Sequence, residues 1–342
     1  MMIHIDGSQG EGGGQVLRSS LCLSLMTQKE LEITNIRAGR SKPGLRAQHL
    51  KAVEAAGLIG RAQVSGADLG STALTFRPTE IQPGRYHFDI GTAGATTLVL
   101  QTIFLPLALS GAKSTVTITG GTHVRWSPSY HYLELHWLPF MRQIGCQIDL
   151  KMELAGYYPQ GGGRVSATIY PCEQIGPLEL TDRGKLKHIR GISAISNLPR
   201  HIARRQREQV LRRIGDRYNL SDIRLVELAS RFKGTMLLLL AEFEHSQACY
   251  FSLGELGKPA ERVADEAIEE LEEFLSTDGA IDQYLADQLL LPLTFASGPS
   301  RLHTSKITRH LLTNAQVLRS FLPVQIDIEG DLGTPGLISI KP

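Results

Sequence analysis

Leu105-Pro106-Leu107 recurs in this sequence as Leu291-Pro292-Leu293, and each copy is followed a few residues later by a Ser-Gly pair. Both copies lie near the end of an apolar segment with helical periodicity. Because proline is unfavourable inside a helix, its recurrence at the same place in two helices indicates a shared structural unit. The sequence therefore predicts internal repetition.

The segments around these two stretches follow one plan, which occurs three times along the chain. An apolar helix leads to a turn of small residues, an alternating strand follows, and a second helix leads into another strand. The expected first helices are 15–26, 97–109 and 281–295, and the expected second helices are 46–57, 129–144 and 311–322. We expect three units of two helices and four strands each, which together form one large domain.

The segment 184–278 departs from this plan. Its expected elements are a strand at 188–195, a basic helix at 199–218, strands at 223–228, 235–244 and 248–253, and an acidic helix at 259–276. Such alternation is typical of the α/β or α+β class. We predict a large domain of residues 1–183 plus 279–342, with a smaller α/β domain of residues 184–278 inserted between the second and third units.

The composition is that of a folded chain with little net charge. Of its 342 residues 42% are hydrophobic, and 36 Lys and Arg against 34 Asp and Glu leave a formal charge of +2. Local cation clusters must therefore bind any polyanion. The longest clean apolar run, 236–241, is far shorter than the ~20 residues of a membrane helix. With no signal-peptide pattern and no CxxC pair, we expect a cytoplasmic protein with reduced cysteines and no membrane partner.

A glycine-rich segment, Asp6-Gly7-Ser8-Gln9-Gly10-Glu11-Gly12-Gly13-Gly14-Gln15, precedes the first expected helix. Its backbone N–H groups could converge on an anion at the helix N-terminus. It matches neither the P-loop nor the dinucleotide-binding pattern. A carboxylate among these glycines would repel phosphate unless a cation lay between them, so Glu11 suggests a ligand for Mg²⁺ or Mn²⁺. A simple tight turn is the alternative.

Four cations within ten residues form a basic loop that leads into the helix with Gln48 and His49: Arg37, Arg40, Lys42 and Arg46. Three of the four are arginine, whose planar fork suits phosphate. A solvated charged loop is the alternative.

The helix 199–218 holds a denser set of arginines: Arg200, Arg204, Arg205, Arg207, Arg212, Arg213 and Arg217. Glu208 and Asp216 interrupt this set. We therefore favour a surface that faces solvent or another domain over one that binds the RNA backbone.

Polar residues stand in the otherwise apolar first helices: Gln15, Arg18, Gln101, Tyr284, Asp287 and Gln288. Asp287 should face a cleft or meet a cation, because an unpaired buried carboxylate is costly. His310 stands where the third unit's second helix begins. The positive helix end disfavours imidazolium, which predicts a neutral, nucleophilic histidine. A structural role is the alternative, because lone histidines are more often structural than catalytic.

Five motifs together resemble the RNA 3′-terminal phosphate cyclases, in the catalytic branch of that family. They span nearly the whole chain in the family's order: Glu11-Gly12-Gly13-Gly14-Gln15, residues 37–45, Tyr158-Pro159-Gln160-Gly161-Gly162-Gly163, Tyr284-Leu285-Ala286-Asp287-Gln288, and His310-Leu311-Leu312-Thr313-Asn314. A triplicated core with one insert is also that family's architecture. The resemblance implies ATP-dependent conversion of an RNA 3′-phosphate to a 2′,3′-cyclic phosphate, through a covalent histidine-AMP and an RNA-adenylate.

The resemblance also implies residue roles. His310 would carry AMP, and Glu11 would bind Mg²⁺ or Mn²⁺ near the triphosphate. The expected ATP and AMP contacts are Gln15, Gln101, Pro128, Phe251, Tyr284, Asp287 and Gln288. The expected contacts to phosphates and RNA are Arg18, Arg37, Arg40, Gln48 and His49. One position departs from the family pattern, since Ala155 stands where Arg or His usually precedes the glycine before Tyr-Pro-x-Gly-Gly-Gly.

Two rival functions remain at this stage. A catalytically inactive, cyclase-like RNA-binding factor for ribosome assembly is one, although His310, Glu11 and Asp287 argue against it. An enolpyruvyl transferase with the same repeat is the other, and the basic loop does not exclude it. The expected partners are RNA 3′-phosphate ends and ATP, with a homodimer left open.

Overall fold

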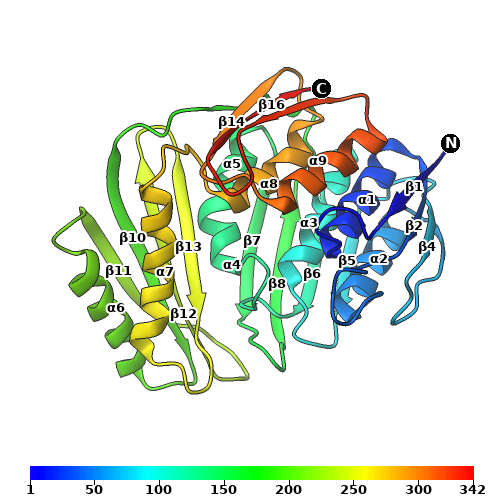
Figure 1. The fold of residues 1–342 in the computed structure, drawn as a ribbon. Helices are drawn as coiled ribbons and strands as arrows, with labels where there is room; N and C mark the ends of the chain where they lie inside the picture. The colour runs from blue at the N-terminus through cyan, green and yellow to red at the C-terminus, as the bar shows by residue number, and fades with distance from the viewer.

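Four four-stranded sheets form the framework of residues 1–342, all of which the computed structural model describes (Figure 1). Three sheets share one strand order, β1-β2-β4-β3, β5-β6-β8-β7 and β9-β14-β16-β15. In each of them the first pair is parallel and the next two pairs are antiparallel. The protein is thus of the mixed α/β (α+β) class, as expected.

Each of these sheets belongs to a run of strand, helix, strand, helix, strand, strand. The first run comprises β1 (Met2–Asp6), α1 (Gly14–Thr27), β2 (Glu30–Thr34), α2 (Ala47–Ile59), β3 (Gln63–Ser65) and β4 (Leu74–Arg77). The second comprises β5 (Arg85–Asp89), α3 (Thr96–Ala108), β6 (Ser114–Gly120), a composite helix, β7 (Ile148–Leu154) and β8 (Gly163–Ile169). The third comprises β9 (Glu179–Leu180), α8 (Gln283–Leu293), β14 (Ser300–Thr304), α9 (Arg309–Phe321), β15 (Gln325–Glu329) and β16 (Gly336–Lys341).

The fourth sheet, β11-β10-β12-β13, lies between β9 and α8 in the chain. Its elements are β10 (Leu186–Ser196), α6 (Arg200–Ile214), β11 (Leu220–Glu227), β12 (Gly234–Phe243), β13 (Gln247–Leu253) and α7 (Ala260–Leu275). The sequence placed this inserted segment between the second and third units. Because β9 pairs with β14, β9 is the first strand of the third run, and the inserted segment follows that strand. The domain limits at 184 and 278 stay a prediction.

Both faces of the fourth sheet are covered. Leu237 and Leu239 of β12 face α6 and α7, whereas Leu238 and Leu240 join the large core of the other three sheets. The apolar run at 236–241 is therefore a strand buried on both sides, which accounts for its lack of alternation. No helix of the protein has the length and hydropathy needed to cross a membrane.

Helix α6 packs against the acidic helix α7 (Figure 1). Two arginines of α6 form ion pairs with it, Arg205 with Glu261 and Arg213 with Asp265, and Arg217, just after α6, pairs with Glu272. These arginines therefore face a helix of the same inserted segment, whereas the sequence favoured a surface that faces solvent or another domain. The four cysteines are buried and free.

The second helix of the second run is composite. It consists of α4 (Tyr130–Tyr132), the π-helical η1 (Leu133–Trp137) and α5 (Leu138–Gln143). Pro139 has no N–H to donate to the carbonyl of Leu135, which instead accepts a bond of 2.8 Å from Gln247 Nε2 on β13. The carbonyl that Pro139 leaves free thus bonds the composite helix to the fourth sheet. Periodicity alone predicted an uninterrupted helix there.

Helix α3 lies at the centre of the core, and every one of its residues except Gln101 is buried. Replacing fully buried Ile103 by Ala should lower the free energy of unfolding by about 2–5 kcal/mol, because a cavity remains among well-packed neighbours. Leu58→Ala, at a side chain that is 56% exposed, is the control and should cost less than about 0.5 kcal/mol. Denaturant unfolding measures both. Equal losses would contradict the central place of α3.

Candidate active site

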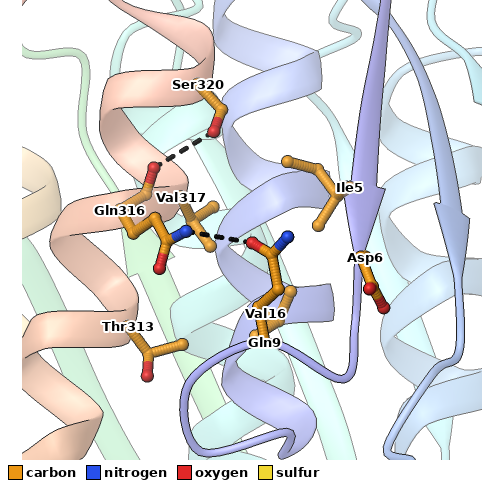
Figure 2. Close-up of a pocket in the computed structure, with 8 residues that line it drawn as sticks. All are labelled: Ile5, Asp6, Gln9, Val16, Thr313, Gln316, Val317 and Ser320. Carbon is orange, nitrogen blue, oxygen red and sulfur yellow. Dashed lines mark hydrogen bonds between the residues drawn. The ribbon is translucent and has the colours of Figure 1, made fainter.

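The glycine-rich loop between β1 and α1 is attached to α9. The backbone N–H of Glu11 donates to Thr313 Oγ1 at 3.0 Å, and Gln316 Nε2 donates to Gln9 Oε1 at 3.0 Å (Figure 2). Gly10 adopts φ +62°, and a Cβ there would lie 2.1 Å from Thr313 Oγ1. Glycine is required at this position both for the left-handed backbone and for the close approach. The loop is thereby fixed next to the helix that carries His310.

Figure 2 also shows a hollow between β1, the loop and α9, lined by Ile5, Gln9 and Val317 among others. Its volume of about 10 Å³ admits no more than a water molecule. A nucleotide cannot bind there, so the chemistry must lie on the side of the loop that faces His310.

His310 is the second residue of α9, whose N-terminus is capped by Thr308 Oγ1, an acceptor for the N–H of Leu311 at 3.0 Å. Its Nδ1 lies 2.9 Å from Asp287 Oδ2, and its Nε2 lies 3.6 Å from Glu11 Oε2. Asp287 belongs to α8 and is buried, while the side chain of His310 is 37% exposed. Three elements distant in sequence thus converge on one imidazole.

The expectation that the helix terminus disfavours imidazolium at His310 is corrected by this geometry. The Asp287 carboxylate raises the pKa of His310 above its ordinary value of 6.5, with further help from Glu11 and against burial and Arg18. A carboxylate in direct contact outweighs the partial charge of a helix end. The hydrogen bond at Nδ1 also selects a tautomer, because Nδ1–H donates to Asp287 and leaves the lone pair on Nε2.

A chain of hydrogen bonds connects α1 with α8 and α9 beneath the His310–Asp287 pair. Arg18 donates to Gln15 Oε1 at 2.8 Å, Gln15 donates to Ser19 Oγ at 3.0 Å, and Ser19 donates to Asn314 Oδ1 at 2.7 Å. Asn314 in turn donates to the carbonyl of Asp287 at 3.2 Å. Ser19 was not predicted. The sequence pattern could have indicated it, because Ser19 is a polar residue one turn after Gln15 in an apolar helix.

The cations of the basic loop surround the anion side of this centre. Arg40 forms an ion pair with Glu11. Burial, together with nearby arginines of which Arg18 acts most strongly, lowers the pKa of His49 to about 3. Burial also lowers the pKa of Arg18 to about 10, although Asp287 and Glu11 raise it. Positive charge therefore accumulates around a neutral His49, as expected for an anion site.

Two residues predicted to contact phosphate are already bonded within the protein. Arg37 donates through one nitrogen to the carbonyls of Lys42 and Gly44, each at 2.8 Å, and so shapes the basic loop. Gln48 Oε1 accepts from the N–H of Ala95 at 2.7 Å, at the N-terminus of α3. Their positioning role could not be read from spacing, because both partners are backbone groups.

The residues predicted to bind the nucleoside lie mainly along α3 and α8. Gln101 Nε2 donates to Gln288 Oε1 at 2.8 Å, and Tyr284, one turn before Gln288, is 47% exposed. The carbonyl of Pro128 accepts from Thr97 Oγ1, one turn before Gln101.

Phe251 reaches this region through Tyr132, at a ring distance of 6.3 Å. The hydroxyl of Tyr132 donates to Asp282, the N-cap of α8, at 3.2 Å. Tyr132 therefore connects Phe251 of β13 with the N-terminus of α8.

Glu11 is the carboxylate best placed for a divalent cation. No group of three or more His, Cys, Asp and Glu side chains could form a metal site by itself. Mg²⁺ commonly uses one or two carboxylates and takes its other ligands from water and substrate phosphates. The ion pairs of the Glu11 carboxylate are with Arg40 and His310, so these residues fit a cation that is bound together with a phosphorylated substrate.

Comparison with known proteins gives a consistent result. The family model for RNA 3′-terminal phosphate cyclase matches residues 9–328. The protein of that name from Nostoc punctiforme is 44% identical over 337 residues, which cover 96% of each chain. The one from Archaeoglobus fulgidus is 42% identical over 331 residues, covering 96% of this chain and 98% of that protein. The chain belongs to the RNA 3′-terminal phosphate cyclase family.

This membership confirms the resemblance drawn from the five motifs, all of which lie inside the matched range. The chain is an enzyme of this ligase-class cyclase family. Among solved structures, the enolpyruvyl transferase NikO from Streptomyces tendae matches with a TM-score of 0.27 and 9% identity, over 100% of this chain and 65% of that one. The family assignment rests on the family model and the relatives, which name the cyclases and not the enolpyruvyl transferases.

Ala155, the departure from the family pattern, is buried and paired with the fourth-sheet segment. Its N–H donates to the carbonyl of Ala229 at 2.8 Å, and its carbonyl accepts from Ser230 Oγ at 2.8 Å. A long cationic side chain at this place would have to displace these neighbours.

Asp287→Asn should lower the pKa of His310 to its ordinary value of 6.5 or below, because the main group that favours imidazolium loses its charge while burial and Arg18 remain. NMR titration of the His310 ring measures this change. Asp278→Asn, at a carboxylate that is 80% exposed and adjacent to His303, is the matched control and should leave the titration unchanged. An unaltered His310 titration in Asp287→Asn would refute the assignment.

Proposed function

We propose that this cyclase-family enzyme uses ATP to convert an RNA 3′-phosphate to a 2′,3′-cyclic phosphate, through a covalent adenylate on His310. The observation that carries the proposal is the His310–Asp287 contact of 2.9 Å beside the glycine-rich loop. It supplies an oriented nucleophile next to an anion site. The relatives from Nostoc punctiforme and Archaeoglobus fulgidus, both named RNA 3′-terminal phosphate cyclase, support the same reaction.

In the first step, His310 Nε2 attacks the α-phosphorus of ATP. The Nε2–P bond forms while the P–O bond to pyrophosphate breaks, and pyrophosphate leaves. The proton on Nδ1 stays hydrogen-bonded to Asp287, whose charge stabilises the ring as it becomes cationic. The raised pKa of His310 has the same origin, since both reflect stabilisation of a positive imidazole.

Charge on the phosphates is balanced by the residues around the loop. Arg18 and Arg40 supply positive charge, and the N-terminus of α1 supplies backbone N–H groups. A divalent cation held by Glu11 and phosphate oxygens would further neutralise the triphosphate. Glu11 would then exchange its contact with Arg40 for the cation and free that arginine for substrate.

Two further transfers complete the reaction. An oxygen of the RNA 3′-phosphate attacks the phosphorus of the histidine adenylate, the N–P bond breaks, and AMP passes to the RNA. The neighbouring 2′-hydroxyl then loses its proton and attacks the 3′-phosphorus, and AMP leaves. Each step displaces a good leaving group, which explains why a covalent intermediate is useful.

Buried polar atoms without partners support substrate contacts at this centre. Asp287 Oδ1 and His49 Nδ1 have no hydrogen-bond partner. Such atoms are rare in proteins and commonly mark places where a ligand or water binds. We assign the nucleoside to the side lined by Gln101, Tyr284 and Gln288, together with Gln15, Pro128 and Phe251, and the RNA phosphate to the side of Arg18, Arg40 and His49.

The rival is a catalytically inactive RNA-binding factor. An RNA-binding role alone does not require His310 to be oriented by the buried Asp287 carboxylate beside Glu11. A cytoplasmic location and a homodimer stay predictions.

Incubation with α-labelled ATP and Mg²⁺ should label the wild-type protein through an acid-labile, alkali-stable bond, as a phosphoramidate requires. His310→Ala should abolish the label because it removes the nucleophile. His303→Ala, on neighbouring β14, is the matched control and should be labelled like wild type. Label on His310→Ala at the wild-type level would refute the proposed nucleophile, and RNA binding without any labelling would favour the inactive factor.

A further inference from the structure

Four loops meet at one end of the molecule, towards the lower edge of Figure 1, where β7 ends and β8 and β12 begin. They are residues 121–128, 155–163, 197–201 and 229–234, and we call them the loop face. His123 bridges Tyr157, Ala155 bridges Ser230, and Asn197 Nδ2 donates to the carbonyls of Ser230 and Phe232 at 2.8 and 3.1 Å. These contacts make the four loops one continuous surface.

The loop face contains four Arg and Lys residues, of which Arg125 is paired with Glu255 from the segment between β13 and α7. None of its four segments includes Asp or Glu. Arg200, Arg231 and Lys233 are exposed, and no ion pair or hydrogen bond engages their side chains. This differs from the helix α6, where Arg205 and Arg213 are paired with α7. In a chain of formal charge +2, such a segregated group of free cations complements a polyanion.

Two aromatic side chains stand out from the same loops. Trp126 is 95% exposed and Tyr158 is 79% exposed, and neither packs against another ring of the protein. Trp126 also has φ +62°, a backbone conformation that is unfavourable for a bulky residue. Exposed rings beside free cations are the two components that single-strand nucleic-acid surfaces combine, since rings stack on bases and cations contact phosphates.

The loop face is continuous with the candidate active site. Gly121 bridges Ala95, whose N–H is bonded to Gln48, the neighbour of His49. Gly161 lies against Ala93 in the same turn. The turn before α3 therefore joins the phosphate side of the active site to the loops that carry Trp126 and Tyr158.

We propose that single-stranded RNA upstream of the reacting 3′-phosphate binds across the loop face. Its bases stack on Trp126 and Tyr158, and its backbone phosphates contact Arg200, Arg231 and Lys233. This inference rests on the proposed function for the identity of the substrate. Stacking and phosphate contacts are independent of sequence, so the surface accepts RNA ends of varied sequence.

Two sets of variants test the proposal through binding of a single-stranded RNA of roughly 12 nucleotides with a 3′-phosphate. Trp126→Ala with Tyr158→Ala should weaken binding at least about fivefold and leave its salt dependence unchanged, because stacking releases no counterions. Arg200→Ala with Arg231→Ala and Lys233→Ala should reduce the slope of log affinity against log salt by about 2, or about 0.7 for each phosphate contact. Fluorescence anisotropy over a range of salt concentrations measures both effects.

Matched controls remove similar side chains elsewhere. Leu58→Ala with Leu69→Ala removes exposed apolar groups, and Arg85→Ala with Lys341→Ala removes exposed cations that form no ion pair. Both should bind RNA like wild type. All variants should keep the wild-type rate of labelling by ATP, which shows that they are folded and that His310 is intact.

Wild-type RNA affinity and salt slope in both test variants would overturn the loop-face proposal and leave the proposed function standing. Equal losses in the test and control variants would overturn it too. Failure of the wild-type protein to become labelled by ATP would instead refute the proposed function, while the binding data would still decide whether RNA lies on the loop face. A loss seen with duplex RNA but not with single-stranded RNA would contradict the single-strand assignment.

Discussion

The contact between Asp287 of α8 and His310 of α9 is the interaction on which the site depends. Asp287 is buried, so its charge is weakly screened and dominates the pKa of His310. A carboxylate can be kept there because it accepts a hydrogen bond from His310 Nδ1 at 2.9 Å and lies close to the cation Arg18. The arrangement that orients the imidazole is thus also the one that makes a buried carboxylate acceptable in an apolar helix.

The rest of the fold keeps these groups in place. Asn314 and Ser19 join α8, α9 and α1 beneath the pair, and Thr313 attaches the glycine-rich loop to α9 above it. Because the Ser19 and Thr313 bonds join segments from opposite ends of the chain, the site forms only when the units are packed together. Positive charge from Arg18 and Arg40 then lies on the open side, where a phosphorylated substrate would approach.

Several features of the site were predictable from sequence because they depend on local pattern. His310 at a helix start, Glu11 among glycines and Asp287 in an apolar helix each break a local rule, which is typical of functional residues. Other features were not predictable. The predicted direction of the pKa shift of His310 was wrong, since the deciding carboxylate lies 23 positions away (310 minus 287) on another helix. Gln48 bonds a backbone group, and spacing carries no information on such partners.

The sequence by itself determined the mixed α/β class, the order of helices and strands and most of the residues at the centre, because periodicity, glycine placement and buried polar groups are local properties. Only the tertiary structure decided which groups meet. It placed Asp287 and Glu11 on either side of His310, paired the arginines of α6 with α7, and left Arg231 and Lys233 free. Electrostatic effects depend on distance through space and on burial, and both arise only when distant segments pack together.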